Sequence, residues 1–146
     1  LLQIAEELRI VFPKIIKDHP LVQMWAYKYD SQLMGINNHA DIAAVNVNFW
    51  ITPDAANTNP KSGGLIVHKA EAPLEWNFNN FNRDEEHIEK FLNQNKSGNI
   101  KVPYAENRMV LFNSNLIHKT DNIAFKTGYE NRRINITMLF GSRMNN

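Results

Sequence analysis

Two stretches of this chain alternate between apolar and polar residues, as does a β-strand that buries one face. In residues 44–52 the apolar face carries Val45, Val47, Phe49 and Ile51, and the other face carries Asn46, Asn48 and Trp50. In residues 133–140 the apolar face carries Ile134, Ile136, Met138 and Phe140, and the other face carries Arg133, Asn135, Thr137 and Leu139. A solvated sheet face would give the same alternation. Amides in place of Lys and Glu favour instead a sheet that is covered by helix on one side and lines a polar cavity on the other.

The rest of the chain predicts more short strands and two helices. Apolar residues at three-to-four spacing predict an amphipathic helix over residues 1–18 that bends or restarts at Pro13. Further strands are expected at residues 21–29, 65–68, around Val102 and at 110–113, and a short helix at 83–93. Many short strands separated by Gly- and Pro-containing turns are typical of a β-sandwich or barrel.

Composition narrows the class of protein. The 146 residues, 43% of them hydrophobic, suffice for one domain with its own core. A net charge of +1 gives no electrostatic reason to bind nucleic acid or an anionic membrane, and no apolar run approaches the roughly 18 residues of a membrane helix. The absence of cysteine excludes disulfides and thiol chemistry and favours a reducing, cytoplasmic setting. Because the chain starts at Leu1 rather than Met, we expect a fragment of a longer protein.

Three residues, His39, Asp41 and His118, carry the strongest chemical signal. His39 and Asp41 are two apart at the start of an extended segment, so their side chains share one face. With His118, which follows an apolar strand, they provide two imidazoles and one carboxylate, the facial triad that leaves half of a divalent metal open to substrate and oxygen. Singly, each residue fits a surface His or a turn-forming Asp equally well. Nitrogen and oxygen ligands also admit Mn, Co, Ni or Zn.

Arg133 is the second candidate for a functional role. It begins an expected buried strand, and no acidic residue lies beside it on the inward face of that strand. A buried guanidinium costs free energy unless it is paired, so Arg133 needs a carboxylate from elsewhere. An ion pair with Glu130 or Asp121 is one solution, and a bound anion is the other. Arg132 has the opposite facing, so we expect it to point outward.

Together these segments resemble the 2-oxoglutarate- and Fe(II)-dependent dioxygenases, nearest to the prolyl-4-hydroxylase-like branch. The resemblance covers residues 22–141 and rests on four features in the family's order: His39-Ala40-Asp41, Ser62-Gly63-Gly64 before a strand, His118, and Arg133 on the last long strand. It implies a mainly β fold with flanking helices, a double-stranded β-helix (jelly roll, cupin-like). The single domain would span residues 1–146, with the N-terminal helix at 1–18 and the jelly-roll core at about 21–141.

The resemblance also implies an activity and a set of roles. Fe(II) would be bound by His39, Asp41 and His118; 2-oxoglutarate and dioxygen would be consumed, giving succinate and CO2, while an unidentified peptide side chain or small molecule is hydroxylated. Ascorbate would be an optional reductant. The distal carboxylate of 2-oxoglutarate would pair with a guanidinium, which binds carboxylates bidentately. The cosubstrate-binding residues implied in this way are Arg133, Thr137, Asn48, Trp50 and Tyr29.

Several alternatives stay open. The interval from His118 to Arg133 is longer than in many family members, so Arg132 remains a possible anchor for the cosubstrate. Core packing is the alternative role for Trp50 and Tyr29. For the whole chain, the alternatives are a non-catalytic jelly-roll binding module and a cupin-type metal-dependent hydrolase or isomerase. The sequence does not indicate the oligomeric state.

Overall fold

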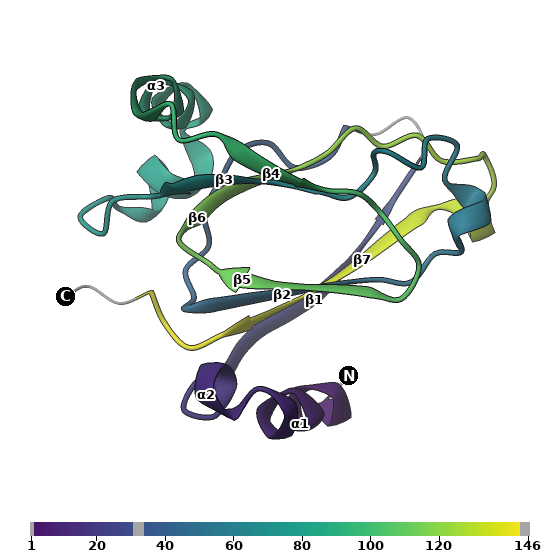
Figure 1. Cartoon of the computed structure of the whole chain (residues 1–146), viewed down its shortest axis with the longest axis horizontal. Helices are drawn as coiled ribbons and strands as arrows, with labels where there is room; N and C mark the ends of the chain where they lie inside the picture. The colour runs from purple at the N-terminus through teal and green to yellow at the C-terminus, as the bar shows by residue number, and fades with distance from the viewer. Residues whose placement is uncertain (1, 31–33, 144–146) are drawn as a thin grey trace.

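Two antiparallel sheets face each other in this computed structural model, which describes residues 2–30 and 34–143 (Figure 1). The larger sheet has the strand order β1 (Leu21–Tyr29), β7 (Arg133–Phe140), β2 (Val45–Trp50) and β5 (Arg108–Asn113). The smaller sheet has the order β4 (Asn99–Val102), β3 (Leu65–Glu71) and β6 (Leu116–Thr120). An isolated bridge between His39 and His118 extends the smaller sheet by one more segment. This is a double-stranded β-helix, as expected.

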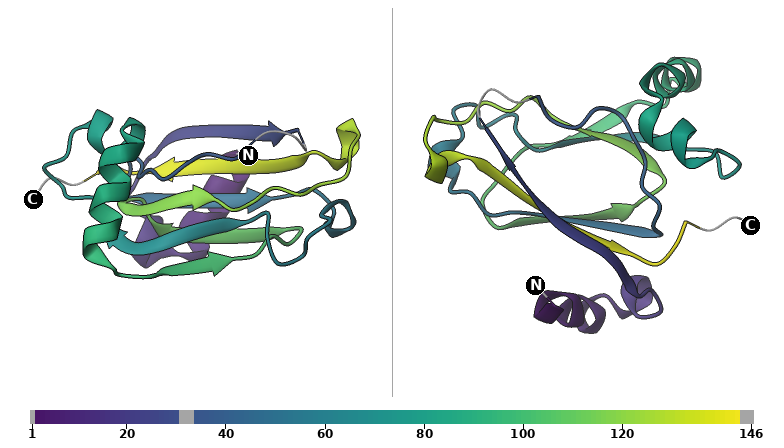
Figure 2. Two further views of the ribbon diagram at one scale, coloured as in Figure 1. Left: turned by 90° about the horizontal axis from the view of Figure 1, so that it is seen from above. Right: turned by 180° about the vertical axis from the view of Figure 1, so that it is seen from behind.

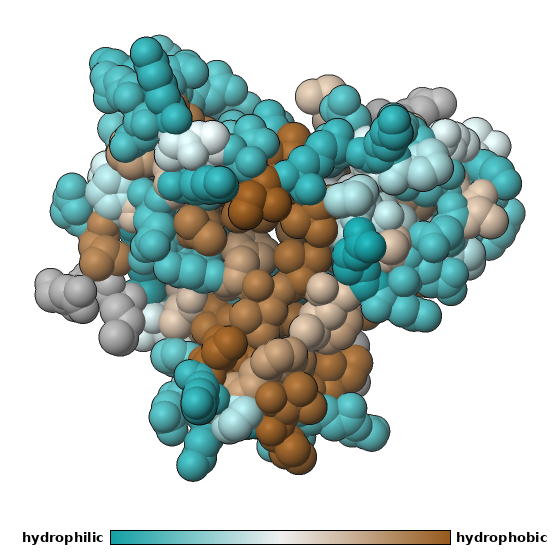
Figure 3. All heavy atoms as spheres, viewed as in Figure 1, coloured by the Kyte–Doolittle hydropathy of each residue, from teal (hydrophilic) through white to brown (hydrophobic). Residues whose placement is uncertain are grey.

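Two short helices cover the outer face of the larger sheet, α1 (Leu2–Val11) and α2 (Pro13–Ile16). The interruption at Pro13 is as predicted, because proline is accepted at the first position of a helix and not in its interior. Buried residues of the helices and the sheet form one apolar cluster: Ala5, Leu8, Ile16, Val45, Val47, Met138 and Phe140. Figure 3 shows apolar residues continuing from between the sheets down to α1. Leu1 and residues 31–33, which the sequence placed in the helix and in the core, lie outside the described residues.

The third helix, α3 (Glu85–Asn95), crosses one end of the smaller sheet (Figure 2). It starts at Asp84, whose side chain accepts a hydrogen bond from the backbone N–H of His87 at 3.0 Å, an N-cap. The single π-helical turn η2 (Asn79–Arg83) precedes it, and short 3₁₀ turns occur at η1 (Asp54–Ala56) and η3 (Tyr129–Asn131). The cluster beneath α3 includes Phe81, Ile88 and, from β6, Ile117. None of the helices among the described residues has the length and apolarity needed to cross a membrane.

The predicted strands differ from the structure in two details. His118 follows the apolar strand β5, as expected, but the chain turns after β5 and His118 lies within a further strand, β6, that the sequence did not predict. The turn is held by the side chain of Asn113, whose Oδ1 accepts a hydrogen bond from the backbone N–H of Asn115 at 2.9 Å. Ile51, expected on the apolar face, lies beyond the end of β2 and is 44% exposed. Pro53 follows closely and has no N–H for a sheet hydrogen bond.

The Gly63-Gly64 pair allows two segments to approach closely. A Cβ built on Gly64 would lie 2.0 Å from the backbone oxygen of Val102, which pairs with β3 from β4. Gly63 has a φ of +83°, a conformation that residues with a side chain rarely adopt. Its carbonyl oxygen is thereby presented to the interior, where it accepts a hydrogen bond from Arg133.

Candidate metal centre and anion pocket

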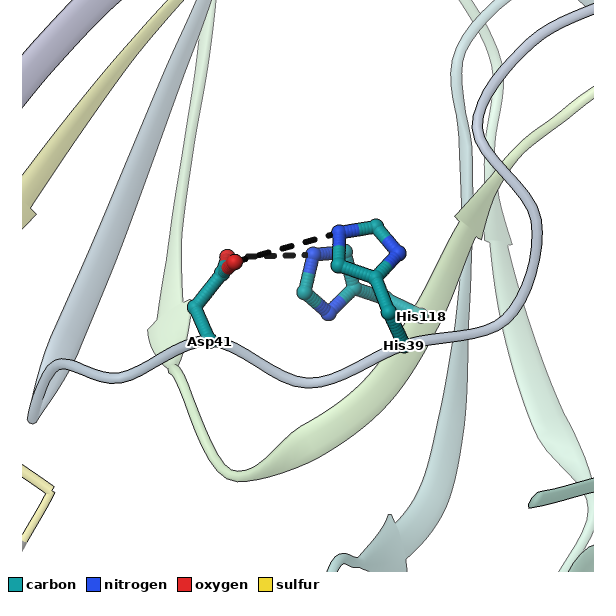
Figure 4. A group of neighbouring side chains, drawn as sticks. All are labelled: His39, Asp41 and His118. Carbon is teal, nitrogen blue, oxygen red and sulfur yellow. Dashed lines mark ion pairs between the residues drawn. The ribbon is translucent and has the colours of Figure 1, made fainter. Parts of the chain in front are cut away.

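The three predicted metal ligands lie together between the sheets (Figure 4). Nε2 of His39 is 3.9 Å from Oδ1 of Asp41, and Nε2 of His118 is 3.5 Å from Oδ2 of Asp41. One ligand atom from each of the three residues lies within 4.8 Å of the others. The backbones of His39 and His118 exchange two N–H···O hydrogen bonds of 3.0 and 2.8 Å, which holds the two imidazoles side by side. A single divalent ion fits such a set of three atoms.

Each histidine presents Nε2 with its lone pair free. Nδ1 of His39 lies 2.7 Å from the carbonyl oxygen of Asn37, and Nδ1 of His118 lies 2.9 Å from that of Leu116. A carbonyl oxygen can only accept, so both Nδ1 atoms carry the proton and both Nε2 atoms can bind a metal. Burial, together with the neighbouring His118, lowers the pKa of His39 to about 4. The His39 imidazole is therefore neutral at physiological pH, as metal binding requires.

The carboxylate of Asp41 is ionised although it is buried. Burial acts to raise its pKa, but its contacts with His118, with His39 and with the amide of Asn46 together hold the pKa below its usual value. Asn46 donates a hydrogen bond of 2.5 Å to Oδ2 of Asp41. The donor set is then two imidazoles and one carboxylate, which fits Fe(II) and related divalent metals. The sequence had placed Asn46 on the cavity face without identifying its contact with Asp41.

A narrow pocket leads from these three residues to Arg133. The guanidinium is buried, with 1% of the residue exposed, and Nε donates a hydrogen bond of 2.5 Å to the carbonyl of Gly63. Nη1 and Nη2 are buried and have no hydrogen-bond partner among the described residues. Burial lowers the pKa of Arg133 to about 10, so the group is still a cation near neutral pH. The rings of Tyr29 and Trp50 lie 5.2 and 5.7 Å from it, which suits a guanidinium.

Neither of the ion pairs considered for Arg133 is present. Asp121 pairs instead with Lys101, at 2.8 Å, and no salt bridge joins Glu130 to Arg133 within the described parts of the chain. Arg132 points outward, as its parity indicated, and pairs with Asp30 at 2.8 Å where both side chains are well exposed. The buried cation therefore faces the pocket without an acidic partner, which leaves two donors free for an anion.

The other predicted site residues separate into two groups. Tyr29, Asn48 and Thr137 line the pocket with Arg133. Burial raises the pKa of the Tyr29 phenol, which keeps it protonated. Trp50 does not line the pocket: its ring stacks on that of Tyr104 at 5.4 Å, behind Arg133, as the core-packing alternative expected.

A second, more open cleft was not foreseen. It has a volume of about 300 Å³ and reaches His39 and Asp41. The aromatic side chains that line it are those of Trp25 and Tyr27, from β1, and of Phe78, which directly precedes η2. Phe78 and Asn82, from the segment between β3 and α3, line this cleft beside His39 and Asp41. His39 and Asp41 thus border two cavities, one ending at a cation and one walled by aromatic rings.

The two stacked sheets and the buried cluster between them define a double-stranded β-helix with a candidate metal centre. No family model and no curated protein matches the sequence. Among solved structures, the chain is similar to HygX from Streptomyces hygroscopicus with iron bound, with a TM-score of 0.58, 11% identity, and coverage of 97% of this chain and 66% of that one. It is also similar to HygX with nickel and 2-oxoglutarate bound, with a TM-score of 0.54, 13% identity, and coverage of 97% and 64%.

The apo form of HygX gives a TM-score of 0.54 at 12% identity, with coverage of 99% of this chain and 69% of that one. The chain thus spans about two thirds of the length of the HygX chains it matches. At such identities the likeness establishes the fold, the mainly antiparallel jelly roll with few helices that the sequence predicted.

Proposed function

We propose that residues 1–146 form a single Fe(II)- and 2-oxoglutarate-dependent oxygenase domain of the hydroxylase type, with the motif order of the prolyl-4-hydroxylase-like branch. The observation that carries the proposal is the pocket with its two unlike ends. At one end lie two imidazoles and a carboxylate, and at the other lies the buried Arg133, whose two Nη atoms have no hydrogen-bond partner among the described residues. A ligand that chelates a metal and ends in a carboxylate matches both ends, as 2-oxoglutarate does.

In this proposal, His39, Asp41 and His118 hold Fe(II), and Arg133 pairs with the distal carboxylate of the cosubstrate. Fe(II) with 2-oxoglutarate supplies the activation of dioxygen, with succinate and CO2 as products and ascorbate as an optional reductant. The protein orients the cosubstrate and excludes water from it. The likeness to HygX, solved with iron and with nickel and 2-oxoglutarate, supports the proposal at the level of the fold.

The two alternative functions account for less of the site. A cupin-type hydrolase or isomerase would use the same three metal ligands, but it needs no buried cation for a cosubstrate carboxylate. A binding module without catalysis needs neither the buried carboxylate nor two histidines whose Nε2 atoms converge on it. Arg133 is the residue that separates these functions, because an unpaired buried guanidinium is costly and persists where a ligand uses it.

Anaerobic titration of the Fe(II)-loaded protein with 2-oxoglutarate tests the proposal directly. We expect the weak visible charge-transfer band of the 2-oxoglutarate chelate to rise and saturate at one equivalent, followed by succinate release when oxygen is admitted. Succinate, which lacks the keto group, serves as the control ligand and should give no band. Stoichiometric Fe(II) binding without any band would contradict the cosubstrate assignment and bring the hydrolase alternative forward.

We further propose that the substrate reaches the metal through the second, more open cleft, which is lined by Trp25, Tyr27 and Phe78. Apart from His39 and Asp41, none of the described residues that line this cleft has a charged side chain, so an uncharged group of the substrate fits it best. A candidate substrate is recognised as a compound that accelerates succinate release. Replacing Phe78 with Ala should raise the concentration of that compound needed for half-maximal acceleration, because the cleft loses an aromatic ring that would contact it. The affinity for 2-oxoglutarate, measured with Mn(II), should stay unchanged. A Phe78→Ala protein with weaker affinity for 2-oxoglutarate but unchanged acceleration by the compound would contradict this route.

A further inference from the structure

A continuous chain of hydrogen bonds runs along the inner face of the larger sheet and ends on Asp41. The indole Nε1 of Trp50 donates to Oδ1 of Asn135 at 2.7 Å, and Nδ2 of Asn135 donates to Oγ1 of Thr137 at 2.8 Å. The Thr137 hydroxyl donates to Oδ1 of Asn48 at 3.1 Å. Nδ2 of Asn48 donates to Oδ1 of Asn46 at 2.6 Å, and Nδ2 of Asn46 donates to Oδ2 of Asp41 at 2.5 Å. Every residue in the chain is at most 7% exposed.

The two ends of the chain fix its direction. The indole of Trp50 has only an N–H, so it can donate into such a chain but cannot accept a hydrogen bond from it, whereas the carboxylate oxygen Oδ2 of Asp41 accepts at the other end. The residues between them, three amides and one hydroxyl, can each donate and accept. If all the amides were turned over, Trp50 would face an NH2 group and Asp41 would face a carbonyl oxygen, leaving both ends unsatisfied inside the protein. The donors therefore all point toward Asp41.

We propose that Asn46 and Asn48 are positioning residues of the metal centre, held by a hydrogen-bonded chain that starts at Trp50. Asp41 lies in the segment between the His39 bridge and β2, outside any strand. The hydrogen bond from Asn46 to Oδ2 fixes the orientation of the Asp41 carboxylate, so that it would face an ion held between His39 and His118. The inference rests on the proposed function only in that the three residues bind a divalent metal.

Thr137 has a particular place in this chain. Its single hydroxyl proton is donated to Asn48, and its oxygen receives Asn135. Thr137 is therefore a link between the part of the sheet beside Arg133 and the part beside Asp41. Donation from Thr137 to a bound cosubstrate would leave Oδ1 of Asn48 without its partner, which is costly in a buried site. Arg133, with two free donors, is thus the residue suited to hold the anion, and Thr137 is the one suited to hold Asn48.

The inference is tested by the affinity for Mn(II) alone, followed by the electron paramagnetic resonance signal of the free ion. Asn46→Leu, close in shape but without the amide, should weaken Mn(II) binding about 10–100-fold, the usual cost of losing a partner of a metal ligand. Thr137→Val leaves Asn46 and Asp41 unchanged but removes the hydroxyl that joins Asn135 to Asn48. It should weaken Mn(II) binding on the order of 3–10-fold. The line shape of bound Mn(II) should change in both variants.

Thr52→Val is the matched control. Thr52 is also a buried threonine with two hydrogen bonds, to the carbonyl of Arg132 at 2.8 Å and from the N–H of Ile134 at 2.9 Å, but it is not in the chain. It should lower the melting temperature about as much as Thr137→Val and leave Mn(II) affinity and line shape unchanged. Equal losses of Mn(II) affinity in Thr52→Val and Thr137→Val, or an Asn46→Leu protein with wild-type affinity, would overturn the positioning role. A wild-type protein that binds no Mn(II) would overturn the proposed function itself.

Discussion

We expect the replacement of Asp41 with Ala to abolish stoichiometric Fe(II) binding while the protein stays folded. Asp41 is the single anionic residue of the proposed ligand set, and two imidazoles alone bind Fe(II) weakly. The side chain belongs to none of the apolar clusters, so its loss leaves the core intact. The measurement is anaerobic Fe(II) binding by equilibrium dialysis, with circular dichroism to check the fold.

The control for this experiment is another buried acid. Asp121 is 4% exposed and pairs with Lys101 away from the cluster, so Asp121→Ala removes a buried carboxylate without removing a ligand. It should reduce stability and leave Fe(II) stoichiometry at one. Wild-type Fe(II) affinity in Asp41→Ala would refute the assignment of the metal centre.

Arg133→Ala is expected to weaken the binding of 2-oxoglutarate by about 2–5 kcal/mol, or roughly 30- to several-thousand-fold in affinity. The reason is that the variant loses a charge-assisted pair with a desolvated carboxylate. Arg132→Ala should cost under about 1 kcal/mol, because Arg132 pairs with Asp30 at the exposed surface. Both affinities are measured with Mn(II) in place of iron, so that turnover does not interfere.

The two arginines test different parts of the proposal. The structure pairs Tyr29 with Arg133 across β1 and β7, which sets the register that turns Arg133 inward. A larger loss in Arg132→Ala would mean that this register is shifted by one residue, which would turn every inward residue of β7 outward. If neither substitution affects affinity, 2-oxoglutarate is not the ligand of this pocket.

The alternation of polar and apolar residues was sufficient to predict the faces of the two central strands. Asn46, Asn48, Asn135 and Thr137 face the interior as expected, because side-chain direction in an extended strand depends only on parity. Parity does not say which inward side chains touch. The series of hydrogen bonds that runs from Trp50 to Asp41 joins β2 and β7, whose register the sequence did not reveal. The partners of Asp41 and Thr137 could therefore not be predicted.

The turn before β6 shows a second limit of sequence patterns. The sequence predicted the strand at 110–113 but not the separate strand β6 that follows it, because the side chain of Asn113 that reverses the chain is one Asn among many. Arg133 shows a third limit. The sequence indicates that the strand of Arg133 provides no acidic partner for it. Only the fold shows that Asp121 forms its ion pair with Lys101 and not with Arg133.

The bridge between His39 and His118 has a consequence for the order of folding. The two residues are far apart in the chain, and β2, β3, β4 and β5 all lie between them in sequence. Contacts of such long separation form late, because the loop entropy of the intervening chain opposes them. A partly folded molecule offers a metal only the local pair of His39 and Asp41, so the complete set of ligands exists only after β6 has docked. If the proposed metal centre binds an ion, we therefore expect its uptake to follow folding, with the native state bound in preference to any earlier one.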